Sequence, residues 1–205
     1  MGVGVERFNL DHLEGALREL PSQRHRLAFG AGISERLLPN YESFAREYRY
    51  GDPTLLRRAL GAIWEVVQGG KIALGQIREL QAGCRLGTPD PERFASPLTS
   101  AAIDAANAIH ETLEVCYRDE PRRVAEVASF ARDTVDMFVQ ERDNLDYSDP
   151  GLEERILADP LMIRELTKQQ DELYLLARTD TLGSDFVKEY RTAAAYQGKS
   201  NIDVS

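Results

Sequence analysis

A long, alanine-rich segment runs from Pro97 to Tyr117, PLTSAAIDAANAIHETLEVCY, and its composition limits the folds that this chain can adopt. Ser96 is a good N-cap, and Pro97 suits the first helical position, where its missing N–H has no partner to lose. At roughly 100° per residue, apolar side chains cover most of the girth of this helix. The narrow polar strip that remains consists of Asp104, Asn107, Glu111 and Glu114. Because such a helix must be covered on nearly all sides, we predict a compact multi-helix bundle around it.

The rest of the chain repeats the helical period and contains no strand-like alternation or hairpin signal. Proline and capping residues divide it into further helices. One of these covers residues 22–38 and is expected to end at Pro39, and a short helix is expected to begin at Asn40. We therefore predict an all-α fold with a single domain over residues 1–198. Residues 199–205 have no helical pattern and are expected to form a loose tail.

Composition is typical of an ordinary globular protein, with 42% hydrophobic and 29% charged residues. No apolar run approaches the roughly 20 residues needed to cross a bilayer, and the first residues lack the pattern of a secretory signal. We therefore expect a cytoplasmic protein that does not associate with a membrane. The two cysteines, Cys84 and Cys116, form no CxxC motif, so neither a zinc site nor a disulfide is predicted.

The negative charge of the chain is concentrated in its second half. The net charge is -9, but residues 1–100 hold 13 Lys and Arg against 12 Asp and Glu, whereas residues 101–205 hold 12 against 22. Between Asp133 and Asp159, nine acidic residues are accompanied by two arginines. This balance argues against nucleic-acid binding, which needs clustered Lys and Arg, and suits a basic protein partner. The candidate acidic face consists of Asp136, Glu141, Asp143, Asp146, Asp149, Glu153 and Glu154.

Sequence motifs for catalysis and for cofactors are missing. There is no G-x-S-x-G nucleophile elbow, no Walker loop and no G-x-G-x-x-G after a strand. A di-iron site in a helical bundle needs Glu-x-x-His on two helices, and none of the three histidines has Glu three residues before it. The acidic loop over residues 143–154 does not match the oxygen positions of an EF-hand. We therefore predict no metal and no cofactor.

Five segments stand out by their order and spacing. They are ISERLLPNYESF at residues 33–44, YGDPTLLRRALGAIWEVV at residues 50–67, AAIDAANA at residues 101–108, ILADPLMIRELTKQQDELYLLA at residues 156–177, and the terminal SNI. Together they resemble the YjaG-like bacterial family, also called domain of unknown function 416. The resemblance implies an all-helical fold without an established activity, and it suggests a role in signalling or regulation. The polar positions that match the family are Glu35, Arg36, Asn40, Tyr41, Arg58, Trp64, Glu65 and Asp104.

Four of these polar residues, Arg36, Arg58, Glu65 and Asp104, form a candidate site. On the helix from Pro53, Arg58 and Glu65 share a strip opposite the apolar stripe, and Asp104 lies on the polar strip of the alanine-rich helix. One hypothesis is that these strips face water. A second is that they face each other as a buried ion network, which requires every charge to be paired. A third is an anion-binding cleft that uses Arg36.

Three functions are compatible with these patterns. The first is a protein that acts by contact with a partner through its acidic face, without catalysis. The second is an enzyme or small-anion-binding protein whose cleft lies between the helices beginning at Pro53 and Pro97, beside Tyr41 and Trp64. The third is an acidic, immunity-like inhibitor of a basic toxin. The sequence favours the first and leaves the oligomeric state open.

Overall fold

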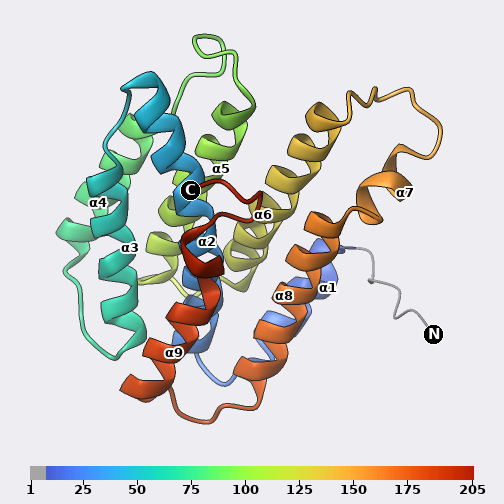
Figure 1. Ribbon diagram of the computed structural model, residues 1–205. Coiled ribbons are helices and arrows are strands. Elements are labelled where there is room, and N and C mark those ends of the chain that lie inside the picture. The colour runs from blue at the N-terminus through green and yellow to red at the C-terminus, as the bar shows by residue number, and fades with distance from the viewer. Residues whose placement is uncertain (1–7) are drawn as a thin grey trace.

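The computed structural model describes residues 8–205, and within this range the chain forms helices and no β-strand (Figure 1). The prediction of an all-α fold is confirmed. The helices in chain order are α1 (Leu10–Arg18), α2 (Gln23–Tyr48), α3 (Pro53–Val67), α4 (Leu74–Gly87), α5 (Pro97–Val115), α6 (Pro121–Arg142), α7 (Leu152–Leu157), α8 (Pro160–Ala177), α9 (Ser184–Ala194) and the short 3₁₀-helix η1 (Tyr196–Gly198).

Helices α3, α5 and α8 begin in the same way, with a capping side chain followed at once by proline. The caps are Asp52, Ser96 and Asp159, which adopt extended backbone conformations. Their side-chain oxygens accept a hydrogen bond from a backbone N–H two or three residues further on, over 2.8–3.1 Å. Each cap satisfies a donor that the first helical turn would otherwise leave unpaired, so the sequence fixes these three starting points closely.

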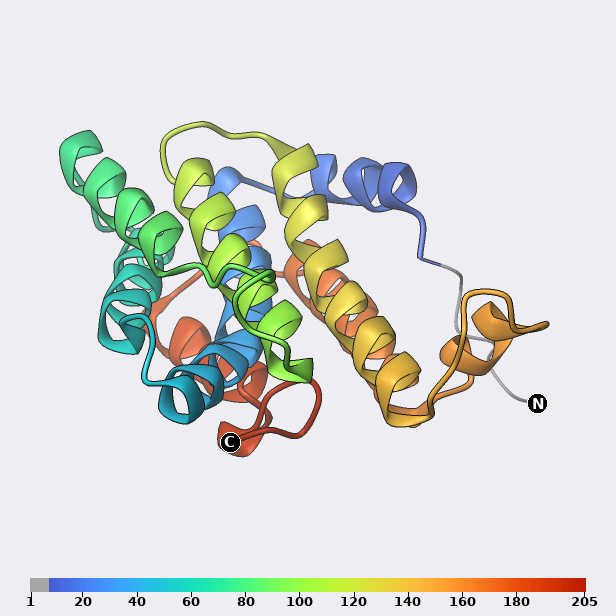
Figure 2. The ribbon, with the colours of Figure 1, turned by 90° about the horizontal axis from the view of Figure 1, so that it is seen from above.

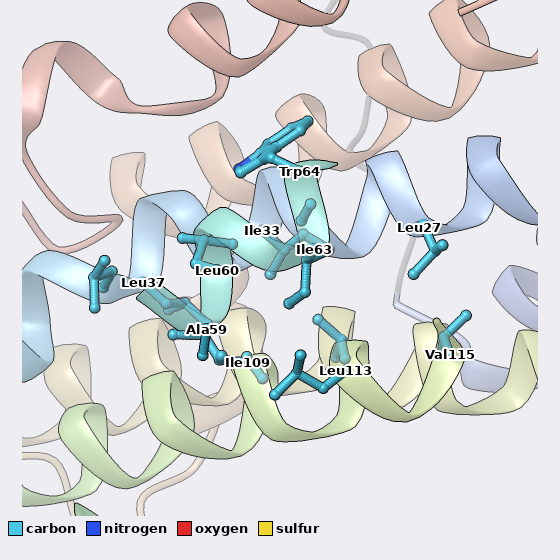
Figure 3. Close-up of a cluster of buried hydrophobic side chains, with 14 of the residues drawn as sticks. Leu27, Ile33, Leu37, Ala59, Leu60, Ile63, Trp64, Ile109, Leu113 and Val115 are labelled. Carbon is cyan, nitrogen blue, oxygen red and sulfur yellow. The ribbon is translucent and has the colours of Figure 1, made fainter. Parts of the chain in front are cut away.

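Helix α2 lies in the middle of the bundle, where it contacts α3, α5, α6, α8 and α9 (Figure 2). Eighteen of its 26 residues are buried. The alanine-rich α5 is also a core helix, as its composition predicts, and it packs against α2, α3, α4 and α6. A Cβ atom on Gly30 would lie 3.1 Å from Thr112 Oγ1, so the glycine allows α2 and α5 to approach closely. Side chains of α2, α3 and α5 pack together in this core (Figure 3), among them Leu27, Ile33, Leu37, Leu60, Ile63, Ile109 and Leu113.

The expectation that Pro39 ends a helix is wrong. Helix α2 continues without interruption from Gln23 to Tyr48, with Pro39 inside it. A proline inside a helix removes one backbone hydrogen bond, which costs about 3 kcal/mol. Leu38 and Tyr41, on either side of this position, are 1% and 0% exposed. Burial of a large apolar side chain contributes about 1.5–3 kcal/mol, so packing against the neighbouring helices offsets the cost of the proline.

The expectation that residues 199–205 form a loose tail is also wrong. Ser200, Asn201 and Ile202 are 0%, 0% and 3% exposed. The backbone N–H of Asn201 donates to the carbonyl oxygen of Arg36 in α2 over 3.1 Å. Its side-chain Nδ2 donates to the carbonyl oxygen of Ala131 in α6 over 2.9 Å. Ser200 and Asn201, whose polar side chains suggest solvent exposure in the sequence, are therefore buried and hydrogen-bonded.

Within residues 8–205, no helix is both long enough and apolar enough to cross a bilayer.

Candidate functional site

A buried ion cluster connects α2 with α8. Arg36 is fully buried, and its guanidinium donates to both carboxylate oxygens of Glu165, with Nη2 to Oε1 at 2.9 Å and Nε to Oε2 at 3.0 Å. Its Nη1 donates to Glu172 Oε2 over 3.1 Å. Glu165 and Glu172 are 0% and 3% exposed. All three guanidinium nitrogens are thus occupied by carboxylates from a single neighbouring helix.

The α8 side of this cluster is a polar stripe within an otherwise apolar helix face. Glu165, Gln169 and Glu172 are four and three residues apart, so they lie on the same face of α8. Gln169 donates through Nε2 to Glu165 Oε1 over 2.8 Å and to the carbonyl oxygen of Ala128 in α6 over 3.2 Å. At the outer edge, the Lys168 ammonium lies 3.4 Å from Glu172. Two carboxylates are therefore matched by two cations, one fully buried and one partly exposed.

In this cluster, burial and ion pairing shift the pKa values of the charged groups in opposite directions. Burial opposes the charged form of Arg36, but the carboxylates of Glu165 and Glu172 outweigh it, so the pKa of Arg36 is raised. Burial raises the pKa of Glu172, and the nearby charges of Arg36 and Lys168 oppose this shift. Burial also raises the pKa of the Tyr190 hydroxyl, which therefore stays protonated at neutral pH. Within residues 8–205, this hydroxyl has no hydrogen-bond partner.

The hypothesis that Arg36, Arg58, Glu65 and Asp104 form one buried ion network is wrong, and the hypothesis that the polar strips face water holds for Arg58 and Glu65. Arg58 and Glu65 are exposed on α3, because this helix turns its apolar stripe toward the core and the opposite strip toward water. Asp104 accepts a hydrogen bond from Thr134 of α6 over 2.8 Å. A buried network around Arg36 does exist, but its partners come from α8, more than 120 residues further along the chain.

Asp104 nevertheless occupies an unusual environment. It is half-buried between α5 and α6, and no cation is paired with it within residues 8–205. Burial raises the pKa of Asp104 to about 7, with a smaller contribution from the neighbouring charge of Asp133. The hydrogen bond from Thr134 acts in the opposite direction. Asp104 therefore changes charge near neutral pH.

The candidate cleft beside Tyr41 and Trp64 is filled. These side chains are 0% and 1% exposed, and α3 and α5 pack directly against each other. The Tyr41 hydroxyl donates to the carbonyl oxygen of Gly87 over 2.8 Å. Trp64 Nε1 donates to Glu35 Oε2 over 2.7 Å, and Glu35 also accepts from Arg191 of α9 over 3.1 Å. These contacts hold helices together, and Tyr41 and Trp64 do not line an open cleft.

The acidic face runs along the end of α6, the following loop and the start of α7. Glu141, Asp143 and Glu154 are exposed, whereas Asp136 is half-buried and lies 2.9 Å from Arg132. The Arg142 guanidinium pairs with Asp143 over 2.8 Å and lowers the pKa of that carboxyl. Of the remaining members, Asp149 is half-buried, and those that are exposed are Asp146 and Glu153. Part of the charge counted in the sequence is therefore balanced by arginines within the fold.

Two large apolar side chains lie among these acids. Tyr147 is 79% exposed and Met137 is 42% exposed, and the Tyr147 hydroxyl lies 4.0 Å from the Met137 sulfur. The α6–α7 connection lies at the edge of the molecule opposite α3 and α4 in both views (Figures 1 and 2). The acidic face is thus combined with an accessible aromatic side chain, which its charge alone did not predict.

Side chains that could hold a metal or act as nucleophiles are few. Residues 8–205 contain no group of three or more His, Cys, Asp or Glu side chains placed to bind a metal ion. Cys84 is buried and Cys116 half-buried, and neither forms a disulfide. Burial raises the pKa of each thiol to about 12, so both are protonated and poorly nucleophilic at neutral pH. The Arg36 guanidinium and the carboxylates of Glu165 and Glu172 are buried and paired, so their geometry suits a structural role.

Comparison with known proteins identifies the family. A family model described as a protein of unknown function, DUF416, matches residues 12–205. The chain belongs to the DUF416 family. The resemblance found in the sequence is thereby confirmed.

Relatives and a solved structure cover nearly the whole chain. The uncharacterized protein YjaG of Escherichia coli (strain K12) is 28% identical over 192 residues, which cover 92% of this chain and 93% of that protein. YjaG of Salmonella typhimurium (strain LT2) is 26% identical over 193 residues, with 92% and 94% covered. The crystal structure of a DUF416 family protein from Shewanella baltica OS155 superposes with a TM-score of 0.84 at 23% identity, covering 94% of this chain and 97% of that one. At this identity the likeness establishes the shared fold.

Proposed function

We propose that this protein acts by binding a basic protein partner through its acidic face, as a cytoplasmic component of a signalling or regulatory pathway. The observation that carries the proposal is Tyr147, which is 79% exposed in the middle of the acidic segment. Exposed tyrosines are frequent anchors of protein interfaces, because they bury a large area and lose little conformational freedom. Surrounding carboxylates would attract a basic surface and orient it before contact.

Position and charge both support this proposal. The acidic face lies at the edge of the fold, at the end of α6 and along the α6–α7 connection (Figure 1). Glu141 and Glu154 on this face are exposed, so a partner can reach them without local unfolding. Met137 adds a flexible apolar contact beside Tyr147. An aromatic anchor surrounded by charges is the arrangement found at the centre and rim of many transient interfaces.

Affinity capture with the full chain tests the proposal. The purified protein is immobilised, and bound proteins are quantified by mass spectrometry for the wild type and for Glu141→Gln/Tyr147→Ala/Glu154→Gln. The matched control is Glu47→Gln/Glu79→Gln, which removes two exposed acids on α2 and α4, outside the acidic face. We expect the triple variant to lose a basic partner that the control retains. The captured partner is then purified and the complex is reconstituted from the two pure proteins.

Salt dependence gives a second criterion. Raising the salt concentration from about 0.1 M to about 1 M shortens the Debye length from about 10 Å to about 3 Å, so a complex steered by charge weakens severalfold. If the purified partner binds the triple variant as tightly as it binds the wild type, the proposed surface is refuted. If the partner is a basic toxin that the protein inhibits, the immunity-like function holds and the same face is the inhibitory surface.

A further inference from the structure

A groove between the end of α2 and the start of α3 has a charge opposite to that of the chain as a whole. Its volume is about 590 Å³, larger than that of the grooves beside α8, which are about 540 Å³ and 370 Å³. Three of its six lining residues are arginines and one is acidic. The lining consists of Glu42, Arg46, Pro53, Thr54, Arg57 and Arg58. We call this feature the arginine groove.

Helical spacing explains why these side chains meet. Thr54, Arg57 and Arg58 are separated by three and four residues, so a hydroxyl and two guanidiniums lie on one face of the first two turns of α3. Glu42 and Arg46 are four residues apart on the last turns of α2 and line the opposite wall. The groove is therefore built by two rigid helices, which is a good basis for a defined ligand geometry.

Contacts within the groove hold two of the arginines and leave the third available. Arg57 pairs with Glu42, with its Nε 3.1 Å from Oε1. Arg46 donates through Nη2 to Ser43 Oγ over 3.0 Å and to the carbonyl oxygen of Ser205 over 2.8 Å. Arg58 is exposed and has no hydrogen-bond or ion-pair partner within residues 8–205.

The local charge favours an anion. Three guanidiniums and one carboxylate line the arginine groove, although the chain as a whole carries a net charge of -9. At physiological ionic strength charges further away than about 8 Å are largely screened, so the lining dominates the potential inside the groove.

We propose that the arginine groove binds a small, soluble, phosphate-bearing molecule. Guanidinium groups present a planar set of donors that matches two phosphate oxygens at once, which a lysine cannot reproduce. Arg58 provides an unpaired guanidinium, and Arg57 shares its charge between Glu42 and the ligand. Arg46 lines the groove from α2. The site is separate from the acidic face, so a ligand here could act while the protein partner is bound.

Binding of pyrophosphate to the full chain, measured by isothermal titration calorimetry at constant ionic strength, tests this inference. The variant Arg57→Gln/Arg58→Gln removes two donors from the groove. The matched control is Arg78→Gln/Arg178→Gln, which removes two exposed arginines outside it. We expect each groove arginine to contribute about tenfold in affinity, so the groove variant should bind about 100-fold more weakly while the control is unchanged.

Several results would overturn the inference. The first is that the wild type does not bind millimolar pyrophosphate. The second is that the groove and control variants weaken pyrophosphate binding equally. Thermal unfolding of both variants checks that they fold, and Arg58→Lys provides a milder change that should weaken binding while keeping the charge. Cosedimentation with vesicles that contain phosphatidic acid tests for a phosphate carried by a lipid. We expect no cosedimentation, and vesicle binding that the groove variant loses would refute a soluble ligand.

Because the arginine groove and the acidic face lie on different elements, their tests are independent. Loss of pyrophosphate binding in the groove variant should leave capture of the basic partner intact. Conversely, the triple variant of the acidic face should bind pyrophosphate as the wild type does. A change in both measurements with either set of substitutions would contradict the assignment of two separate sites.

Discussion

Replacing Asp104 with asparagine should stabilise the protein at neutral and alkaline pH. Asp104 is half-buried between α5 and α6, where it accepts a hydrogen bond from Thr134 and has no cation to balance its charge within residues 8–205. Asparagine has nearly the same shape, and its side-chain oxygen can accept the same hydrogen bond. The substitution therefore removes the buried charge and retains the contact.

The size and the sign of the effect follow from the two pKa values. In the unfolded chain Asp104 titrates near 3.8, and in the folded protein burial raises its pKa to about 7. Between these values the folded protein holds a proton that the unfolded chain has released, so rising pH favours unfolding. A shift of about 3 pKa units corresponds to about 4 kcal/mol. Because Asp104 is half-buried and water screens part of its charge, we expect Asp104→Asn to raise the free energy of unfolding by about 2–4 kcal/mol above pH 7.

Urea denaturation of the wild type and Asp104→Asn at a series of pH values measures this gain directly. The difference between the two free energies of unfolding should be small near pH 4, grow up to about pH 7 and then remain constant. Thr134→Val serves as a companion variant, because loss of its hydroxyl should raise the pKa of Asp104 further and extend the slope to higher pH. A difference that does not change with pH would refute burial of the Asp104 charge.

Substitutions at three further places test the packing of the fold. Arg36→Met leaves Glu165 buried without its guanidinium partner and should lower the free energy of unfolding by about 3–5 kcal/mol. Adding Glu165→Leu should restore part of the lost stability. A loss below about 1 kcal/mol in urea denaturation would contradict the buried pairing. Asn201→Ala removes two buried side-chain hydrogen bonds and should cost about 1–3 kcal/mol, accompanied by faster proteolysis of the C-terminal segment. Gly51→Ala should lower the free energy of unfolding by about 1–2 kcal/mol or more, since Gly51 has φ = 80° and a Cβ atom there would collide with the Tyr41 hydroxyl. An unchanged melting temperature would contradict this collision.

Local signals in the sequence were sufficient for the fold class and for several helix boundaries. The caps before α3, α5 and α8 are read directly from Asp52, Ser96 and Asp159, because an N-cap and the proline after it act within one turn. Pro39 carries an equally strong local signal, yet it is overridden. Its effect on α2 depends on burial against other helices, and that burial is a property of the whole fold.

The partners of Arg36 could not be inferred from helical spacing near Arg36 itself. Glu165 and Glu172 are separated from it by 129 and 136 residues, and no local pattern specifies contacts over such distances. A usable signal did exist on α8, because Glu165, Gln169 and Glu172 share the face that also carries Leu166 and other buried apolar residues. Polar side chains on an apolar helix face must be paired on burial, so they mark where a partner such as Arg36 has to be sought.

The acidic face could be predicted from the sequence to a greater extent than the arginine groove. The acidic face is formed by one continuous segment, so its composition is visible at once, although the exposure of Tyr147 is not. The arginine groove joins the end of α2 to the start of α3, and it requires the turn over residues 49–52 to bring Arg46 opposite Arg58. Arg58 was a candidate site residue, but it was grouped with Glu65 and Asp104 and not with Arg46 and Arg57, which line the groove beside it.

The central position of α2 has a consequence for how the chain reaches its native state. This helix is covered by segments as distant as α8, α9 and Asn201, so its apolar sides are fully covered only when most of the polypeptide has been made. We expect a fragment that stops before α5 to aggregate or to require a chaperone, because it would present these sides to water. Division of the chain in the loop between α4 and α5 should therefore yield two pieces that fold when they are mixed and fail to fold separately.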